Sequence, residues 1–228
     1  MRTTYIGTQP TLGIGASASA LLYCIACPVG PYYPTGFKAV SLEATSEAIR
    51  AWPGGAGNRK LGSNYAPCIL PQLEAAKRGF QQNLWLFGED ERLTEAGAMN
   101  VFVVFRDGAG RMELATPELD GMILEGVTRD SVLALAREQL AAEGWLVSER
   151  VVTMPELAAA AEAGKLVEAF GVGTAAVVTP IRSIGWNGKM VSCGLAPDQE
   201  AGETAVRVKT WIEEIQYGEL EHEWSTPV

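Results

Sequence analysis

Residues 54–65, GGAGNRKLGSNY, place a single lysine inside a glycine-rich loop. The loop follows a short run typical of a strand, residues 40–43, and precedes a run typical of a helix that begins at Ser63 or Asn64 and ends before Gly79. Because glycine has no side chain, a flat ligand can approach the backbone of such a loop closely. The sequence therefore predicts a strand, a ligand-binding loop and a helix, in that order.

Two side chains in and after this loop have the chemistry to act on a ligand. Lys60 lies in the loop, and a desolvated lysine can lose its proton and bond to an aldehyde cofactor. Glu95, in LTEAGAMN at residues 93–100, is expected in a turn, where an acid can pair with a ring nitrogen. Taken separately, a surface lysine in a flexible loop and an ordinary acid in a turn are the alternatives.

Length and charge limit the class of protein. The chain has 228 residues, 47% of them hydrophobic, which suffices for one large domain or two small ones. The net charge of −9 argues against a nucleic-acid partner, because phosphate binding needs cationic side chains. No apolar run reaches the roughly 18 residues of a membrane helix, so we expect no membrane partner.

Cysteine and histidine usage narrows the chemistry further. The four cysteines are typical of a reducing compartment rather than of a disulfide scaffold. Cys24 and Cys27 have the spacing of a redox or metal pair, but they lie in an apolar strand-like run, so we expect core residues. The single histidine, His222, is expected at the surface, which leaves little support for a histidine metal site or a Ser-His-Asp triad.

Periodicity and turn residues predict one mixed core of the α/β or α+β class. Thr153, followed by Pro155 and Glu156, is typical of a helix start. The tripeptide WNG at residues 186–188 is typical of a tight hairpin turn. Further strands are expected at residues 17–29, 83–87, 99–105, 111–115, 145–152, 175–184 and 189–193, and further helices at residues 128–143 and 205–217.

Two short segments could receive a phosphate group. Residues 126–129, GVTR, open an expected helix, and residues 171–175, GVGTA, are expected to join a helical stretch to a strand. Each offers backbone N–H groups and a hydroxyl, as anion sites at helix N-termini and backbone nests do. Each is also compatible with an ordinary capped helix start or turn.

Six motifs occur in an order that resembles a known family: YIGTQPTLG (5–13), PVGPY (28–32), RAWPGG (50–55), LWLFGED (84–90), ATPELDG (115–121) and IQYG (215–218). The chain resembles the branched-chain amino acid aminotransferases of eukaryotic type, which are class IV aminotransferases. The resemblance implies a fold-type IV enzyme with a D-amino acid aminotransferase-like large domain and pyridoxal 5'-phosphate as cofactor. It implies that residues 1–33 are a remnant of the small N-terminal domain with the start of a linker, and that residues 34–228 are the large cofactor-binding domain.

The same resemblance implies roles for individual residues. Lys60 would carry the cofactor and shuttle the proton, Tyr65 would bind its phenolic oxygen and Glu95 its ring nitrogen. Val127, Thr128 and Thr174 would hold its phosphate group. On the substrate side the matching residues are Arg2, Leu12, Ile14, Tyr32, Ala98, Thr174 and Ala175. In the family Leu12 and Ile14 would reach into the neighbouring subunit's site, which implies a homodimer.

Three positions depart from the family pattern. Ala98 stands where a threonine lines the substrate site, so one hydroxyl contact would be absent. Ala176 and Thr179 replace a redox-active cysteine pair, so that switch is not expected. The resemblance also implies that most of the small domain is not part of this chain, and we therefore expect weak cofactor binding and little transamination from this chain alone.

The implied reaction transfers the amino group of leucine, isoleucine or valine to 2-oxoglutarate, reversibly, giving 2-oxo acids and glutamate. The alternatives are another class IV enzyme, such as a D-amino acid transaminase or aminodeoxychorismate lyase, and a non-catalytic or inactive fragment. A transit peptide would precede Met1, so the resemblance leaves the cytoplasm and the mitochondrion open.

Overall fold

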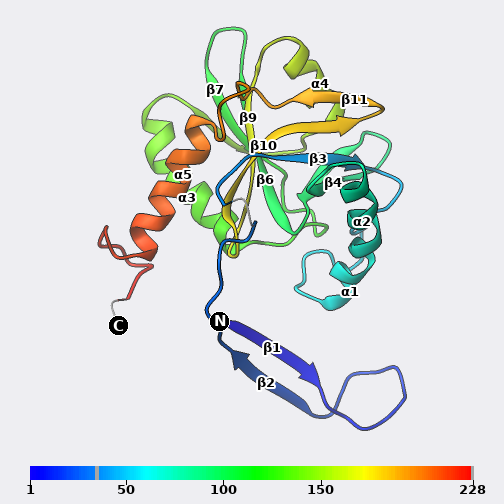
Figure 1. Cartoon of the computed structure of the whole chain (residues 1–228). Helices are drawn as coiled ribbons and strands as arrows, with labels where there is room; N and C mark the ends of the chain where they lie inside the picture. The colour runs from blue at the N-terminus through cyan, green and yellow to red at the C-terminus, as the bar shows by residue number, and fades with distance from the viewer. Residues whose placement is uncertain (34–35, 227–228) are drawn as a thin grey trace.

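The computed structural model describes residues 1–33 and 36–226, which form a large body and a separate hairpin (Figure 1). Pro34 and Thr35, where the sequence places the boundary between two domains, lie outside the described residues. The body contains both helices and strands, which confirms the expected mixture of α and β structure.

A closed ring of strands forms the centre of the body. Starting from β10, each strand hydrogen-bonds to the next in the order β10-β3-β4-β5-β6-β9, and β9 pairs again with β10. The pairs β10–β3 and β3–β4 are parallel and the others antiparallel. The ring strands are β3 (Val40–Thr45), β4 (Gln82–Phe87), β5 (Arg92–Ala96), β6 (Met99–Arg106), β9 (Leu166–Gly173) and β10 (Val177–Trp186).

Further strands extend the ring on its outside. β7 (Met112–Thr116) pairs with β6, β8 (Leu146–Glu149) pairs with β7, and β11 (Lys189–Ser192) pairs with β10. The β10–β11 hairpin turns at Asn187 and Gly188, with φ angles of 49° and 73°. Two successive positive φ angles are typical of the tight turn that the WNG sequence predicted.

The ring separates two hydrophobic clusters, and β6 contributes to both. Val101 and Val103 pack in a cluster with side chains from all six ring strands and from α4 (Met154–Glu162). Phe102 and Val104 pack on the other side against α3 (Val127–Ala142) and α5 (Glu203–Gln216). Because successive strand residues point to opposite faces, one uninterrupted apolar strand fills both clusters.

The expected helix after the glycine-rich loop is divided into three parts. These are α1 (Gly62–Tyr65), the 3₁₀ turn η1 (Ala66–Cys68) and α2 (Ile69–Lys77). Pro67 lies within the 3₁₀ turn, and a proline has no N–H for the helical ladder and crowds the preceding turn. The end of the helix is as predicted, since Gly79 has a φ of 94° two residues after α2.

One expected helical stretch is a strand. Residues 171–175 were predicted to connect a helical stretch to a strand, but the preceding residues form β9, and residues 174–176 are the turn between β9 and β10. β9 is buried along its length except at Val167 and Gly173, which are half-buried. A strand covered on both faces lacks the apolar–polar alternation that identifies an exposed strand, and sequence periodicity alone misassigns it.

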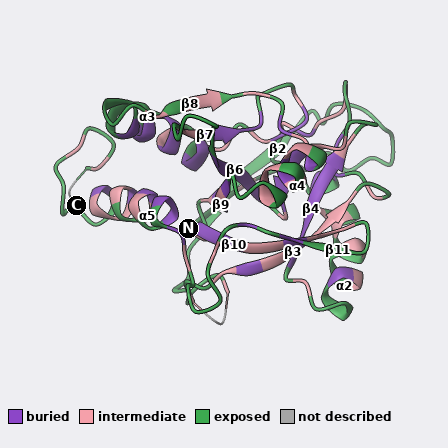
Figure 2. Cartoon of the chain, turned by 90° about the horizontal axis from the view of Figure 1, so that it is seen from above, coloured by how far each residue is buried: buried purple, intermediate pink, exposed green. Residues whose placement is uncertain are grey.

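The β1–β2 hairpin projects from the body and pairs with no other described strand. β1 (Arg2–Gly7) and β2 (Ala20–Ile25) pair antiparallel, and every residue of β2 is exposed. Figure 2 shows β2 in the exposed colour and β4 in the buried colour. The expectation that Cys24 and Cys27 belong to a core is therefore wrong, because both are exposed and Cys27 lies beyond the strand.

Glu168 of β9 attaches α5 to the ring. Its side chain lies among buried residues and accepts hydrogen bonds from the backbone N–H groups of Thr204 (2.7 Å) and Ala205 (3.1 Å). These groups belong to the first turn of α5, where backbone donors have no helical partner and the helix dipole favours an anion. The Glu168 carboxylate thus caps the N-terminus of α5, where the N-cap residue Gly202 has no side chain to do so.

We predict that Glu168→Ala lowers the free energy of unfolding by about 3 kcal/mol, because two buried donors lose a charged acceptor. Glu168→Gln should lose less, since one acceptor oxygen stays. Glu162→Ala, at an exposed position in α4, is the control and should change stability by no more than about 0.5 kcal/mol. Urea unfolding measures all three; equal values for Glu168→Ala and Glu162→Ala would contradict the anchoring role.

Candidate active site

Lys60 and Tyr65 lie next to each other at the end of the glycine-rich loop. Lys60 is exposed, and its Nζ lies 4.8 Å from the centroid of the Tyr65 ring. The Tyr65 hydroxyl is buried and has no hydrogen-bond partner among the described residues. A buried hydroxyl of this kind is costly unless it binds something, so its position beside the Lys60 amine indicates a ligand site.

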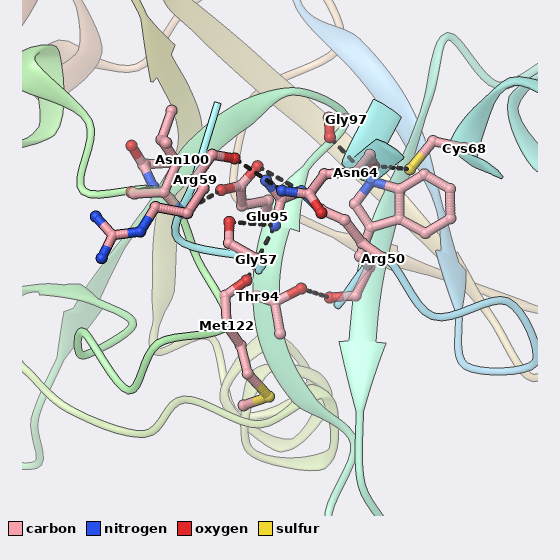
Figure 3. Close-up of polar contacts among 12 residues, drawn as sticks. Arg50, Gly57, Arg59, Asn64, Cys68, Thr94, Glu95, Gly97, Asn100 and Met122 are labelled. Atoms are coloured by element: carbon pink, nitrogen blue, oxygen red, sulfur yellow. Dashed lines mark hydrogen bonds and ion pairs between the residues drawn. The ribbon is translucent and has the colours of Figure 1, made fainter. Parts of the chain in front are cut away.

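Glu95 is fully buried and lies in β5, not in the turn that the sequence predicted. The strand pairs with β4 on one side and places Glu95 opposite Asn100 of β6 on the other. Short strands with polar residues, as in RLTEA, give a weak sequence signal, and pairing on both sides here overrides it. One Glu95 oxygen accepts the N–H of Leu124 at 2.7 Å, and the other lies 3.0 Å from the Nε of Arg50 (Figure 3).

Arg50 is the residue that sequence reasoning missed. Its side chain is 1% exposed, and besides Glu95 it donates from Nη1 to the carbonyl oxygens of Gly57 (3.2 Å) and Met122 (2.9 Å). The motif RAWPGG included this arginine, but gave no reason to bury it. A cation in the segment between a strand and a glycine-rich loop, followed by an acid later in the chain, was the only available signal.

The surroundings of Glu95 act on its ionisation in opposite directions. Burial raises the pKa of Glu95, because the charged form loses its hydration. Arg50, the Leu124 N–H and Lys60 each lower the pKa by stabilising the carboxylate. Burial also raises the pKa of the nearby Cys68 thiol, which donates to the Asn64 carbonyl oxygen at 3.3 Å.

The glycine-rich loop is held by the Asn64 side chain and by a close approach to residue 122. Asn64 donates through Nδ2 to the carbonyl oxygens of Ala56 (2.5 Å) and Arg59 (2.7 Å). A Cβ on Gly57 would overlap the Met122 carbonyl oxygen and the Ala51 methyl group. Glycine is required there because the two backbones touch.

The start of α3 lies beside this site. Asn100 of β6 donates through Nδ2 to the Leu124 carbonyl oxygen at 2.9 Å, and a Cβ on Gly126 would overlap its Oδ1. Val127 and Thr128 follow directly as the first helical residues, as predicted, with Thr128 buried and Val127 exposed. The free backbone donors of a helix N-terminus are thereby brought close to Glu95.

The turn after β9 belongs to the same end of the sheet. Asn100 is paired with Glu95 on one side and with Val172 on the other, and Val172 is paired with Val178. Thr174 and Ala175 lie in the turn just beyond this row, and both are exposed. Val177, at the end of the turn, has a φ of 58°, which is strained for a β-branched residue.

Other residues expected at the site have different locations. Ala98 is exposed in the turn between β5 and β6. Arg2 lies in β1, and Leu12 and Ile14 lie in the loop between β1 and β2, a hairpin that is directed away from the body in Figure 1. Leu12 and Ile14 are fully exposed, and Tyr32 is exposed with its ring packed edge-on against Tyr33. The described residues thus gather the expected cofactor side and leave the hairpin residues apart from it.

Comparisons with known proteins identify the family. The profile of the family described as amino-transferase class IV matches residues 4–184 of the chain. The chain therefore belongs to the class IV aminotransferases. The same comparisons show which members it resembles and how much of each it covers.

Two curated relatives are named as branched-chain-amino-acid aminotransferases. The cytosolic protein of Saccharomyces cerevisiae is 57% identical over the whole chain, and the mitochondrial protein of Schizosaccharomyces pombe is 50% identical. The crystal structure of the Escherichia coli branched-chain amino acid aminotransferase superposes with a TM-score of 0.70 at 27% identity, over 94% of this chain and 64% of that one. The chain spans 61% and 53% of the lengths of the two curated relatives.

We predict that Gly57→Ala distorts the loop that carries Lys60 and lowers the free energy of unfolding by about 1–3 kcal/mol, because the added methyl group has no room. Gly62→Ala is the matched control, since nothing lies within 4 Å of a Cβ there and alanine suits the helix that begins at Gly62. Chemical unfolding of both variants gives the comparison. A Gly57→Ala variant as stable as the wild type would show that the close approach is not required.

Proposed function

We propose that this chain provides the cofactor-binding side of a pyridoxal 5'-phosphate-dependent branched-chain aminotransferase. The observation that carries the proposal is Lys60 next to the buried, unpartnered hydroxyl of Tyr65, in the same site as the buried carboxylate of Glu95. The class IV family supports the same conclusion. An amine, a phenol and an acid around one space match the three polar edges of a pyridoxal ring.

The residues present fit this cofactor. Tyr65 has a hydroxyl in need of a partner, which the phenolic oxygen of the cofactor would supply. Glu95 would face the ring nitrogen, and the backbone N–H groups of Val127 and Thr128 would receive the phosphate group. Thr174, in the turn after β9, would add a hydroxyl to the phosphate. When bound, pyridoxal 5'-phosphate acts as an electron sink that stabilises negative charge at the substrate Cα.

Each side chain then has a defined task. Lys60 is the exposed amine of the site. Once neutral, it would take the proton from the substrate Cα and return it after the amino group has moved. Glu95 would keep the ring nitrogen protonated by offering it a carboxylate, and Tyr65 would fix the ring by its hydroxyl. The backbone of Ala175 would donate to the substrate carboxylate from the turn after β9.

Leucine, isoleucine and valine are the proposed amino donors, with 2-oxoglutarate as acceptor and the corresponding 2-oxo acids and glutamate as products. The names of the relatives support this choice. Arg2 would bind a substrate carboxylate, whereas Leu12, Ile14 and Tyr32 would provide apolar contacts. Ala98 adds no hydroxyl to the substrate side. An apolar pocket selects against polar amino acids through the cost of burying their side chains.

Domain organisation and assembly follow from the hairpin. We propose that residues 1–33 belong to a second, small domain and residues 34–228 to the large domain, because among the described residues the hairpin shares no strand pairing with the body. A homodimer would cover Leu12 and Ile14 with the neighbouring subunit and bring them to its site. The exposed apolar side chains Ile69, Leu70 and Leu73 on α2 are suited to the same contact.

The compartment is proposed from the relatives, which include cytosolic and mitochondrial proteins, so both remain candidates. In the part of the chain that the structure describes, no helix combines the length and hydropathy needed to cross a bilayer.

We predict that borohydride reduction of the protein with pyridoxal 5'-phosphate fixes the cofactor on the peptide containing Lys60. The reason is that Lys60 is the lysine next to Tyr65. Mass spectrometry of the digested protein identifies the labelled peptide. Lys77→Ala, on the exposed side of α2, should leave the label in place, whereas Lys60→Ala should remove it. A label that survives in Lys60→Ala would refute the assignment.

A substrate panel tests the reaction. We predict glutamate formation from leucine and 2-oxoglutarate, and none from D-alanine, when the chain is joined to the remaining part of the S. cerevisiae cytosolic relative. The chain alone should produce far less, because the hairpin residues are apart from Lys60. Activity with D-alanine instead of leucine would favour another class IV enzyme. Absence of activity in the joined protein, with Lys60 still labelled, would favour a non-catalytic cofactor-binding fragment.

A further inference from the structure

Arg50 connects three parts of the site through one side chain. Its Nε lies 3.0 Å from Glu95, and its Nη1 donates both to Gly57 in the lysine loop and to Met122 in the segment that leads to α3. Its Cζ lies 5.9 Å from the centroid of the Tyr65 ring. Figure 3 shows Arg50 among Glu95, Gly57 and Met122 with these contacts dashed. No other described side chain contacts both the loop backbone and Glu95 by hydrogen bond or ion pair.

The ion pair between Arg50 and Glu95 affects the ionisation of Glu95. The side chains of Arg50 and Glu95 are 1% and 2% exposed, so neither charge is stabilised by bulk water. An arginine stays protonated at any pH the protein meets, and a buried carboxylate without its cation would take up a proton. A protonated Glu95 would lack the negative charge that stabilises a protonated ring nitrogen.

The geometry also sets where the carboxylate lies. Arg50 binds one Glu95 oxygen, and the Leu124 N–H binds the other. The Met122 carbonyl oxygen, two residues before Leu124, binds Arg50 in turn. The acid, the lysine loop and the start of the segment before α3 are therefore fixed with respect to one another by the planar guanidinium group.

We infer that Arg50 is a positioning residue of the aminotransferase site, which keeps Glu95 ionised and holds it in register with the Lys60 loop. This inference rests on the proposed function, in which Glu95 faces the ring nitrogen of pyridoxal 5'-phosphate. In this role Arg50 acts through Glu95. A lysine could replace the charge but not the donors that reach Gly57 and Met122 from the same plane.

The test compares two probes that differ at one atom. The first is pyridoxal 5'-phosphate, and the second is its 1-deaza analogue, in which a carbon replaces the ring nitrogen. Each is titrated into the full chain and followed by its absorbance, for the wild type, Arg50→Gln and Arg50→Lys. We expect Arg50→Gln to weaken binding of pyridoxal 5'-phosphate at least about tenfold more than binding of the analogue, because only the former presents a nitrogen to Glu95.

A purely structural role would give a different pattern. If both probes lose affinity by the same factor in Arg50→Gln, the inference is overturned. Arg50→Lys should recover part of the difference between the probes, since the charge remains. Arg150→Gln is the control: Arg150 pairs with Glu113 and Glu156 and packs on Phe105, at the opposite end of β6 from Asn100, and its loss should leave the ratio of the two affinities unchanged.

A double substitution keeps the test decisive if Arg50→Gln fails to fold. Arg50→Gln with Glu95→Gln removes both buried charges, and its ratio of affinities should equal that of Glu95→Gln alone. A further change of the ratio in the double variant would show that Arg50 acts independently of Glu95. If the wild type binds neither probe, the proposed function fails and the inference with it, whereas wild-type binding with equal losses in the variants overturns the inference alone.

Discussion

Closure of the ring by β9 is the constraint on which the site depends. β9 hydrogen-bonds to β6 on one side and to β10 on the other, so the register of each ring strand is tied to that of its neighbours. Glu95, Asn100 and Val172 are directly opposite one another in adjacent strands as a result. A shift of one residue in β6 would send Glu95's partner to the wrong face and also exchange the two hydrophobic clusters. The positions of Glu95 and of the turn after β9 are therefore set by the whole ring of strands and not by local loops.

The candidate site contains a buried ion pair, Arg50 with Glu95. Arg50 and Glu95 lie where hydrophobic side chains would pack more cheaply, since a buried ion pair is weak evidence for stability. Each Glu95 oxygen nevertheless has one partner, the Leu124 N–H for one and Arg50 for the other, and Arg50 also donates to the Gly57 carbonyl oxygen in the glycine-rich loop. Such an arrangement is expected where an ionised group must be presented to a ligand in a fixed direction.

The sequence predicted the features with strong local signals. Gly144 follows α3 and Gly79 follows α2 with positive φ, the WNG turn forms a hairpin, and Thr153 accepts a hydrogen bond from the N–H of Glu156 at the start of α4. These depend on residues within one turn of each other. The six motifs likewise indicated the family and therefore the mixed fold.

What the sequence did not reveal depends on long-range pairing. β5 and β9 were missed because one is short and polar and the other is buried on both faces. Arg50 had no recognisable role because Glu95, Gly57 and Met122 come together only after the ring has closed. Cys24 and Cys27 were misjudged for the same reason, since an apolar run shows which residues could be covered and not whether anything covers them.

The different surroundings of β9 and the hairpin should also give their backbone amides different rates of hydrogen exchange. Backbone amides exchange with solvent deuterium only when their hydrogen bonds open. Those of β9 are enclosed by strands on both sides, so their exchange requires the ring itself to open and reports the global unfolding of the body. Those of β1 and β2 have one neighbour and a solvated surface, and they open by fraying. The amide hydrogens of the hairpin should therefore exchange much faster than those of the ring of strands that holds the site.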